Sequence, residues 1–276
     1  MSVAFQGEPG AYSEEAIFGY FGSGATTQPC ETFEAVFAAV SGGACQYGLI
    51  PIENSLAGSI HQNYDLLSQQ SLSIVGEYYL RIHHCLIALP GARLADIHRV
   101  ISHPQGLAQC AGFLRRLGHV KPEAVYDTAG SVKMLKESGD PSTAAIASRR
   151  AAEIYAMQVL QEGIEDNPEN FTRFLVIARQ PVLPLQNAKT SIVFALKNEP
   201  GSLFKALSVF ALRDIDLSKI ESRPLVGKPW EYLFYIDFLG STAEERVRKA
   251  LDHLSEYALM LRVFGSYPRS KINPPA

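Results

Sequence analysis

The repeated order of a short apolar strand, a polar junction and an amphipathic helix most constrains how this chain of 276 residues can fold. Small hydroxyl or amide side chains stand at five such junctions: Ser13, Asn54, Ser102, Thr128 and Ser148. Open α/β sheets bind ligands at the carboxyl ends of their strands, where junctions of this kind lie. Helix capping explains any one of these residues alone, whereas five together favour a shared anionic ligand.

Two of the predicted helices begin at distinctive residues. A polar run, ENSLAGS, stands where the strand YGLIPI stops, ahead of a helix expected through Tyr64 to Leu67. Backbone N–H groups and hydroxyls converge at such a place, which favours anion binding. Pro104 starts the other helix. Its apolar residues fall on one helical face, which predicts that the helix continues to Leu117.

A polar, cationic pair, Thr172 and Arg173, interrupts the predicted strand NFTRFLVI. Neighbouring strand residues leave opposite faces unless a bend or bulge turns both toward one cavity. Arginine is shaped to hold a carboxylate at two points, and a threonine hydroxyl is a compact proton donor. The pair therefore suits a substrate with carboxylates and a leaving oxygen. The alternative is that the pair simply marks the end of a strand and that the arginine side chain extends into solvent.

The composition excludes several classes of function. Charged residues make up 19% of the chain and the formal net charge is -3, so no surface for nucleic acid is expected. No apolar run approaches the roughly 20 residues of a membrane span, and the start, MSVAFQGEPG, lacks a signal-peptide pattern. We therefore expect a cytoplasmic protein that binds neither membranes nor nucleic acid and whose partner is a small molecule.

Neither the cysteines nor the paired histidines form a metal-binding pattern. The four cysteines lack C-x-x-C spacing, which is typical of reduced thiols rather than of a zinc site or a disulfide frame. His83, His84 and Cys85 are adjacent on a predicted strand, so their side chains point to opposite faces and cannot easily share one ion. We therefore expect no structural metal.

The composition changes at residues 181–188, where two prolines and no regular period predict a linker. Beyond it the pattern is strand, helix, strand, strand, helix, strand, with the last strand expected at Leu259 to Val263. This βαββαβ order is the split ferredoxin-like unit. The turn NEPGSLFKAL stands at a helix start and could cradle a carboxylate. We expect the tail, residues 269–276, to be disordered.

Six dispersed segments identify a family resemblance. GEPGAYSEEA, IPIENSLAGSI, SHPQGLAQC, DTAGSV, AAIASRRAAEIY and NFTRFLVIAR occur in this order and spacing in prephenate dehydratases. The C-terminal part resembles the ACT regulatory domain. The resemblance spans about Val3 to Pro268 and implies an α/β catalytic domain over residues 1–180. That domain resembles the two-lobed type II periplasmic-binding fold, with its second lobe at about 80–160, and an α+β ferredoxin-like ACT domain occupies 189–268.

The resemblance implies loss of water and carbon dioxide from prephenate, which gives phenylpyruvate in phenylalanine synthesis and needs no cofactor or metal. The family motif TRF falls on Thr172, Arg173 and Phe174. By resemblance the threonine assists the leaving hydroxyl, the arginine holds a carboxylate and the phenylalanine packs below. The remaining substrate-binding candidates are polar junction residues: Ser13, Asn54, Ser55, Ser102, Gln105, Thr128 and Ser148.

Two titratable residues have open roles. Glu53 matches a family position that could serve as a general acid or base, or it could cap the start of a helix. His103 could be a base with a pKa near neutrality, or it could fix the turn before Pro104.

The ACT resemblance implies phenylalanine as an allosteric effector and a homodimer or homotetramer. ESRP is present intact, whereas Ser202 and Phe204 depart from the usual GALV form of the ligand loop. The effector candidates lie in the ligand loop, in ESRP and on the strand that contains ESRP: Asn198, Gly201, Ser202, Leu203, Leu217, Ser218, Glu221, Ser222, Arg223 and Pro224.

Two other functions compete with this reading. Arogenate dehydratase performs the same reaction on the transaminated substrate, and YDLLSQ, HHCLIALPG and TRFLVIARQP look similar to the plant enzymes. A non-catalytic amino-acid sensor would need the arginine clamp but would have no use for the hydroxyl of Thr172. The presence of all six motifs therefore favours an enzyme.

Overall fold

The structure is a computed structural model that describes residues 1–225 and 231–270. The chain divides into two compact units. The first comprises Met1–Asn63 and Tyr78–Phe174, and the second comprises Tyr64–Glu77 and the chain from Leu175 onward. Most of the tail predicted to be disordered, residues 271–276, lies outside the described residues.

The first sheet has the order β2-β1-β3-β11-β5, with a short strand β4 beside β3. Strand β1 pairs in parallel with both β2 and β3, and its residues Val3, Ala4 and Phe5 are fully buried. Two of the strands, β5 and β11, run from one unit into the other. The elements are β1 (Ser2–Gln6), α1 (Tyr12–Phe21), β2 (Thr26–Cys30), α2 (Phe33–Ser41), β3 (Tyr47–Asn54), β4 (Gly58–Ser59), α3 (His61–Gln69), β5 (Ser73–Arg81) and β11 (Phe171–Ala178).

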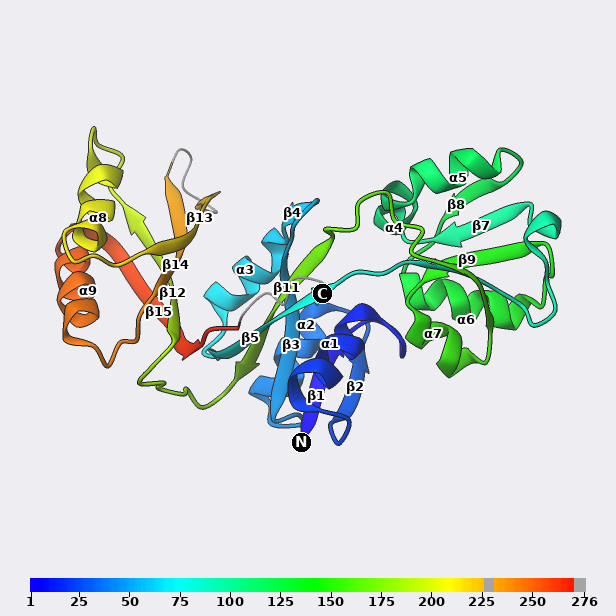
Figure 1. Ribbon diagram of the computed structural model, residues 1–276. Coiled ribbons are helices and arrows are strands. Elements are labelled where there is room, and N and C mark those ends of the chain that lie inside the picture. Colours follow the sequence, from blue (N-terminus) through cyan, green and yellow to red (C-terminus); the bar gives the residue numbers. More distant parts are fainter. Residues whose placement is uncertain (226–230, 271–276) are drawn as a thin grey trace. The chain divides into compact units, whose positions relative to one another are not determined.

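The second sheet has the order β10-β6-β9-β7-β8 and belongs wholly to the first unit. Strand β7 pairs in parallel with β8 and β9, while β6 pairs antiparallel with β9 and β10. Helices α4 and α5 lie on one side of this sheet, and α6 and α7 lie on the other (Figure 1). The elements are β6 (Cys85–Ala88), a short 3-10 helix (Leu94–Asp96), β7 (Arg99–Ser102), α4 (Pro104–Gln109), α5 (Ala111–Leu117), β8 (Lys121–Ala124), α6 (Thr128–Ser138), β9 (Thr143–Ala147), α7 (Arg149–Tyr155) and β10 (Gln158–Glu162).

The helix predicted from Pro104 to Leu117 is interrupted at Cys110, which makes that prediction wrong. The interruption has a tertiary cause in the later residue Asp166. Its backbone N–H donates to the carbonyl of Gln109, and its Oδ2 accepts from the N–H of Gly112 at 2.8 Å. In a continuous helix, the carbonyl of Gln109 and the N–H of Gly112 would instead bond to other residues of the same helix.

Glu53 lies in a strand rather than at the start of a helix. It pairs with Ser59 in the β3–β4 ladder, and the next helix begins only at His61. The capping role considered for its carboxylate therefore does not apply, because ENSLAGS forms a strand end and a turn.

The C-terminal elements follow the predicted βαββαβ order. They form a separate sheet, β13-β14-β12-β15, whose neighbouring strands are all antiparallel. Both helices, α8 and α9, lie on one face of this sheet (Figure 1) and pack on a core that includes Phe194, Phe210 and Phe238. The last strand extends well beyond its predicted end. The elements are β12 (Ala188–Leu196), α8 (Ser202–Ala211), β13 (Leu217–Pro224), β14 (Tyr232–Leu239), α9 (Glu245–Tyr257) and β15 (Ala258–Pro268).

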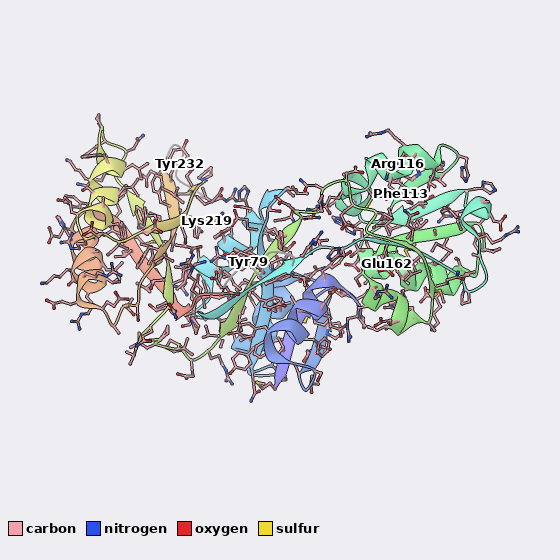
Figure 2. The ribbon with its side chains drawn as sticks, viewed as in Figure 1. Tyr79, Phe113, Arg116, Glu162, Lys219 and Tyr232 are labelled. Carbon is pink, nitrogen blue, oxygen red and sulfur yellow. The ribbon has the colours of Figure 1, made fainter. Side chains whose placement is uncertain are left out.

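Labelled side chains can be followed on elements of both units. On α5 the Arg116 guanidinium lies 5.9 Å from the ring centroid of Phe113, and both residues are labelled in Figure 2. In the second unit, Lys219 and Tyr232 stand on the paired strands β13 and β14 (Figure 2). None of the helices among residues 1–225 and 231–270 is both long and apolar enough to cross a membrane.

Candidate active site

A cavity of about 570 Å3 lies in the first unit and is lined from both of its sheets. The first sheet contributes residues that end β3 and begin β11, and the second contributes the segments that follow β7 and β8. The predicted site residues that line it are Ser13, Asn54, Gln105, Thr128, Thr172 and Phe174. Four of the five strand-to-helix segments noted in the sequence therefore reach one cavity, through Ser13, Asn54, Gln105 and Thr128.

Thr172 projects from β11 beside Asn54, which ends β3. The Oδ1 of Asn54 accepts backbone N–H bonds from Leu56 at 3.1 Å and Ala57 at 2.9 Å. Because a backbone N–H can only donate, these bonds set the orientation of the amide. The Nδ2 of Asn54 then donates to Thr172 Oγ1 at 3.0 Å. The hydroxyl hydrogen of Thr172 is not used in this contact and remains available to a substrate.

Helix starts surround the cavity with backbone N–H donors. Residues in the first turns of α1, α2 and α6 line it, and these helices are nine to eleven residues long. The N-terminus of a helix carries a partial positive charge and unsatisfied N–H groups. Three such ends in one cavity favour a ligand with more than one carboxylate.

A buried aromatic and histidine pair forms another part of the wall. Tyr12 Oη lies 2.8 Å from His84 Nδ1 and donates to the carbonyl of His83, while His84 Nε2 lies 2.8 Å from the amide of Gln109. Burial lowers the pKa of His84, so its imidazole is neutral at pH 7, and burial raises the pKa of Tyr12 well above its usual value. This wall is therefore uncharged and orients the side chain of Gln109.

Arg173 and Thr172 occupy opposite faces of β11. Thr172 and Phe174 both line the cavity, as the alternation of side chains along a strand requires, whereas Arg173 is buried and is not among the lining residues. The assignment of Arg173 as the carboxylate clamp stays a prediction.

Three predicted hydroxyls serve the framework around the cavity. Ser102 donates to the carbonyl of Ile146 at 2.7 Å, Ser148 donates to the carbonyl of Gly10, and Ser55 bonds to the backbone at Glu169 and Phe171. Neither these residues nor Glu53 lines the cavity. Their direct roles in binding or catalysis also stay predictions.

Gly10 permits a close approach between the segment before α1 and helix α7. It adopts φ +91°, and a Cβ there would lie 2.7 Å from Cα of Ala151. Beside it, Glu14 of α1 accepts from Arg150 of α7 at 2.9 Å. These contacts hold the start of α1, including Ser13, against the second sheet and its helices.

Sequence reasoning did not propose Tyr12, Gln109, Asp127 or His84 as site residues, although all four line the cavity. A signal was available for three of them, because Tyr12, Gln109 and Asp127 lie inside the segments GEPGAYSEEA, SHPQGLAQC and DTAGSV. His103 lines the cavity as well. Its Nδ1 accepts from the N–H of Gln105 at the start of α4, as the turn-fixing reading of this histidine requires.

The predicted effector residues lie in the second unit. Gly201 precedes α8 with φ +80°, and Ser202 and Leu203 open that helix. Asn198 lies in the turn before α8. The remaining candidates lie on β13, where side chains alternate between more and less buried positions. Arg223 of this strand forms an ion pair with Asp65 at 3.0 Å within the same unit.

Comparisons with known proteins agree on a family. The family model described as prephenate dehydratase matches residues 3–182. Arogenate dehydratase/prephenate dehydratase 6 of Arabidopsis thaliana is 49% identical over 285 residues, which cover 97% of this chain and 69% of the relative. Arogenate dehydratase 3 of the same plant is 50% identical over 97% of this chain and 67% of its own length.

Two solved structures are similar over nearly the whole chain. The prephenate dehydratase from Arthrobacter aurescens in complex with L-Phe is 33% identical with a TM-score of 0.90, covering 98% of this chain and 90% of its own. GqqA, described as a novel type of quorum quenching acylase, is 37% identical with a TM-score of 0.91 and covers 98% of both chains. The mixed α/β fold of this chain matches both.

Proposed function

The chain belongs to the prephenate dehydratase family, and we propose that its cavity removes water and carbon dioxide together from prephenate or from the transaminated substrate arogenate. The hydroxyl of Thr172 carries this proposal. This hydroxyl belongs to a residue that lines the cavity together with the starts of three helices. Asn54 Nδ2 donates a hydrogen bond to the hydroxyl oxygen.

The chemistry of the elimination matches this arrangement. The ring carboxylate leaves as carbon dioxide, its bonding electrons complete the aromatic ring, and the C–O bond at the opposite ring carbon breaks. One proton must reach the departing hydroxide to form water. Because aromatisation drives the reaction, the protein mainly has to hold the carboxylates and assist the leaving oxygen.

Thr172 would assist the leaving oxygen by donating a hydrogen bond to it. Its Oγ1 already accepts from Asn54 Nδ2, and an oxygen that accepts a hydrogen bond is a better O–H donor. Donors aimed at a developing negative charge are among the largest contributions to catalysis. The start of α1, whose N-cap residue makes no side-chain capping bond, would bind a substrate carboxylate from another wall of the cavity.

We also propose that the catalytic domain is of the two-lobed type II periplasmic-binding kind and that the βαββαβ unit is an ACT regulatory domain that binds L-phenylalanine. The Arthrobacter aurescens relative, a prephenate dehydratase in complex with L-Phe, supports the effector. Effector and substrate would then weaken each other's binding by the same factor. A cytoplasmic homodimer or homotetramer in phenylalanine biosynthesis completes the proposal.

Steady-state turnover of the purified protein on prephenate and on arogenate, with and without phenylalanine, tests the function. We expect turnover of at least one substrate and its suppression by phenylalanine. Turnover of neither would refute the dehydratase proposal. Acylase turnover in its place would favour the activity named for GqqA, and binding without turnover would favour a sensor.

A further inference from the structure

The cavity carries negative but no fixed positive side-chain charge. Three carboxylate side chains line it, those of Glu31, Glu34 and Asp127, whereas no described lysine or arginine does. Of the two lining histidines, His84 is kept neutral by burial, which lowers its pKa, and His103 accepts a hydrogen bond on Nδ1. These side chains disfavour a purely anionic substrate and favour a ligand that also carries a cationic group.

Asp127 is held more firmly than the other two carboxylates. It is the N-cap of α6, and its Oδ1 accepts from the N–H of Gly130 at 2.7 Å. Glu34, by contrast, is exposed and accepts from Gln62 at 2.8 Å. The capping bond fixes the direction of the Asp127 carboxylate and engages only its Oδ1.

A neighbouring acidic residue is already neutralised within the fold. Glu8 forms an ion pair with Lys133 at 3.0 Å and accepts from Tyr126 at 3.1 Å. A second cavity of about 520 Å3 contains Glu8 and shares Glu31 and Asp127 with the first. The carboxylates available to a ligand at this junction of the two cavities are therefore those of Asp127 and Glu31.

We propose that Asp127 is a specificity-determining residue whose carboxylate binds the α-ammonium group of arogenate, so that the chain prefers arogenate to prephenate. This inference rests on the dehydratase function proposed above. The two substrates differ at one carbon of the side chain, which bears an ammonium group in arogenate and a keto oxygen in prephenate. An aspartate stabilises the first and repels the second.

The shape of the substrate places that carbon away from Thr172. The leaving hydroxyl and the side chain are attached to opposite carbons of the ring, so a hydroxyl at Thr172 directs the side chain toward another wall. Thr172 belongs to β11 of the first sheet, whereas Asp127 precedes α6 beside the second sheet, and both line one cavity. Curated relatives at 49–50% identity include proteins named arogenate dehydratase, in agreement with the proposed preference.

The Asp127→Asn variant tests the proposal because asparagine also caps helices well. We expect the ratio of kcat/KM for arogenate to kcat/KM for prephenate to fall about 10- to 100-fold, the range of a hydrogen bond to a charged group. For arogenate, kcat/KM should decrease because KM rises. For prephenate, kcat/KM should increase because the variant lacks the repelling negative charge. Glu137→Gln is the matched control, since it removes one negative charge from an exposed position of the same helix.

The pH dependence of the same ratio provides a second readout on the wild-type protein. Burial raises the pKa of Asp127 and Glu8 raises it further, while the backbone hydrogen bond from Gly130 and, whenever its ring is protonated, His103 lower it. The other titratable groups coupled to it are Tyr126 and Tyr155. As pH falls through this raised pKa the aspartate becomes neutral, so the preference for arogenate should decline in the wild type and stay flat in Asp127→Asn.

Each outcome has one meaning. A wild-type preference for prephenate, or a ratio unchanged in a folded Asp127→Asn protein, would overturn this inference and leave the dehydratase function intact. If that variant fails to fold, a wild-type ratio that does not change with pH would overturn it instead. Turnover of neither substrate would refute the proposed function itself.

Discussion

Exchanging Asn54 for aspartate should remove the donor that supports Thr172 while preserving the shape of the turn. The Asn54→Asp side chain can still accept from the N–H groups of Leu56 and Ala57 through one oxygen. Its other oxygen, however, replaces the Nδ2 that now donates to Thr172 Oγ1, Asn170 Oδ1 and the carbonyl of Phe171. The hydroxyl hydrogen of Thr172 would then turn toward the new carboxylate and away from the substrate.

The magnitude follows from these contacts. Loss of one donor in a catalytic hydrogen-bond network costs about 100- to 1000-fold in kcat. The free energy of unfolding should fall by about 2–4 kcal/mol, since neutral hydrogen bonds contribute about 1 kcal/mol each and a charge would face two acceptor oxygens. Asn54 is only 5% exposed, so the new carboxylate is largely buried beside these acceptor oxygens.

Steady-state kinetics and urea unfolding of Asn54→Asp check both numbers. Asn167→Asp is the control, because it makes the same chemical change at an exposed position where only the side-chain oxygen is used. Burial raises the pKa of the introduced carboxylate, so acidification should protonate it and partly restore stability and turnover. A folded Asn54→Asp protein with wild-type kcat would refute the proposed orientation of Thr172.

Three further substitutions give distinct outcomes. Thr172→Val should lower kcat about 100-fold with little change in substrate binding, whereas Thr172→Ser should retain activity; equal kcat in Thr172→Val and wild type would exclude a role for the hydroxyl. Arg173→Lys should lower kcat/KM about tenfold or more if Arg173 forms a two-point clamp, and wild-type efficiency in that variant would remove the clamp assignment. Arg150→Met should lower the free energy of unfolding by about 1–3 kcal/mol, because it removes a charged bond to buried Glu14, and an unchanged urea midpoint with an unchanged m-value would contradict this.

Much of the site could be predicted from the sequence because strands and helix starts have local signatures. Thr172 and Phe174 share a face of β11 through the alternation of strand side chains, and Ser13 and Thr128 open helices whose starts line the cavity. The same local logic does not predict hydrogen-bond partners that are distant in sequence. Ser102 and Ser148 have the same chemistry as Ser13, yet their hydroxyls donate to backbone carbonyls within the framework.

The sequence by itself therefore determined the alternating α/β order, the βαββαβ order of the C-terminal unit and the common face of Thr172 and Phe174 on β11. These properties depend on periodicity and capping within about ten residues. Only the tertiary structure decided which way the amide of Asn54 points, where Asp166 interrupts the helix after Gln109, and that Asp127 faces the cavity. The physical reason is that buried polar groups must find partners, and those partners can lie more than 100 residues away along the chain.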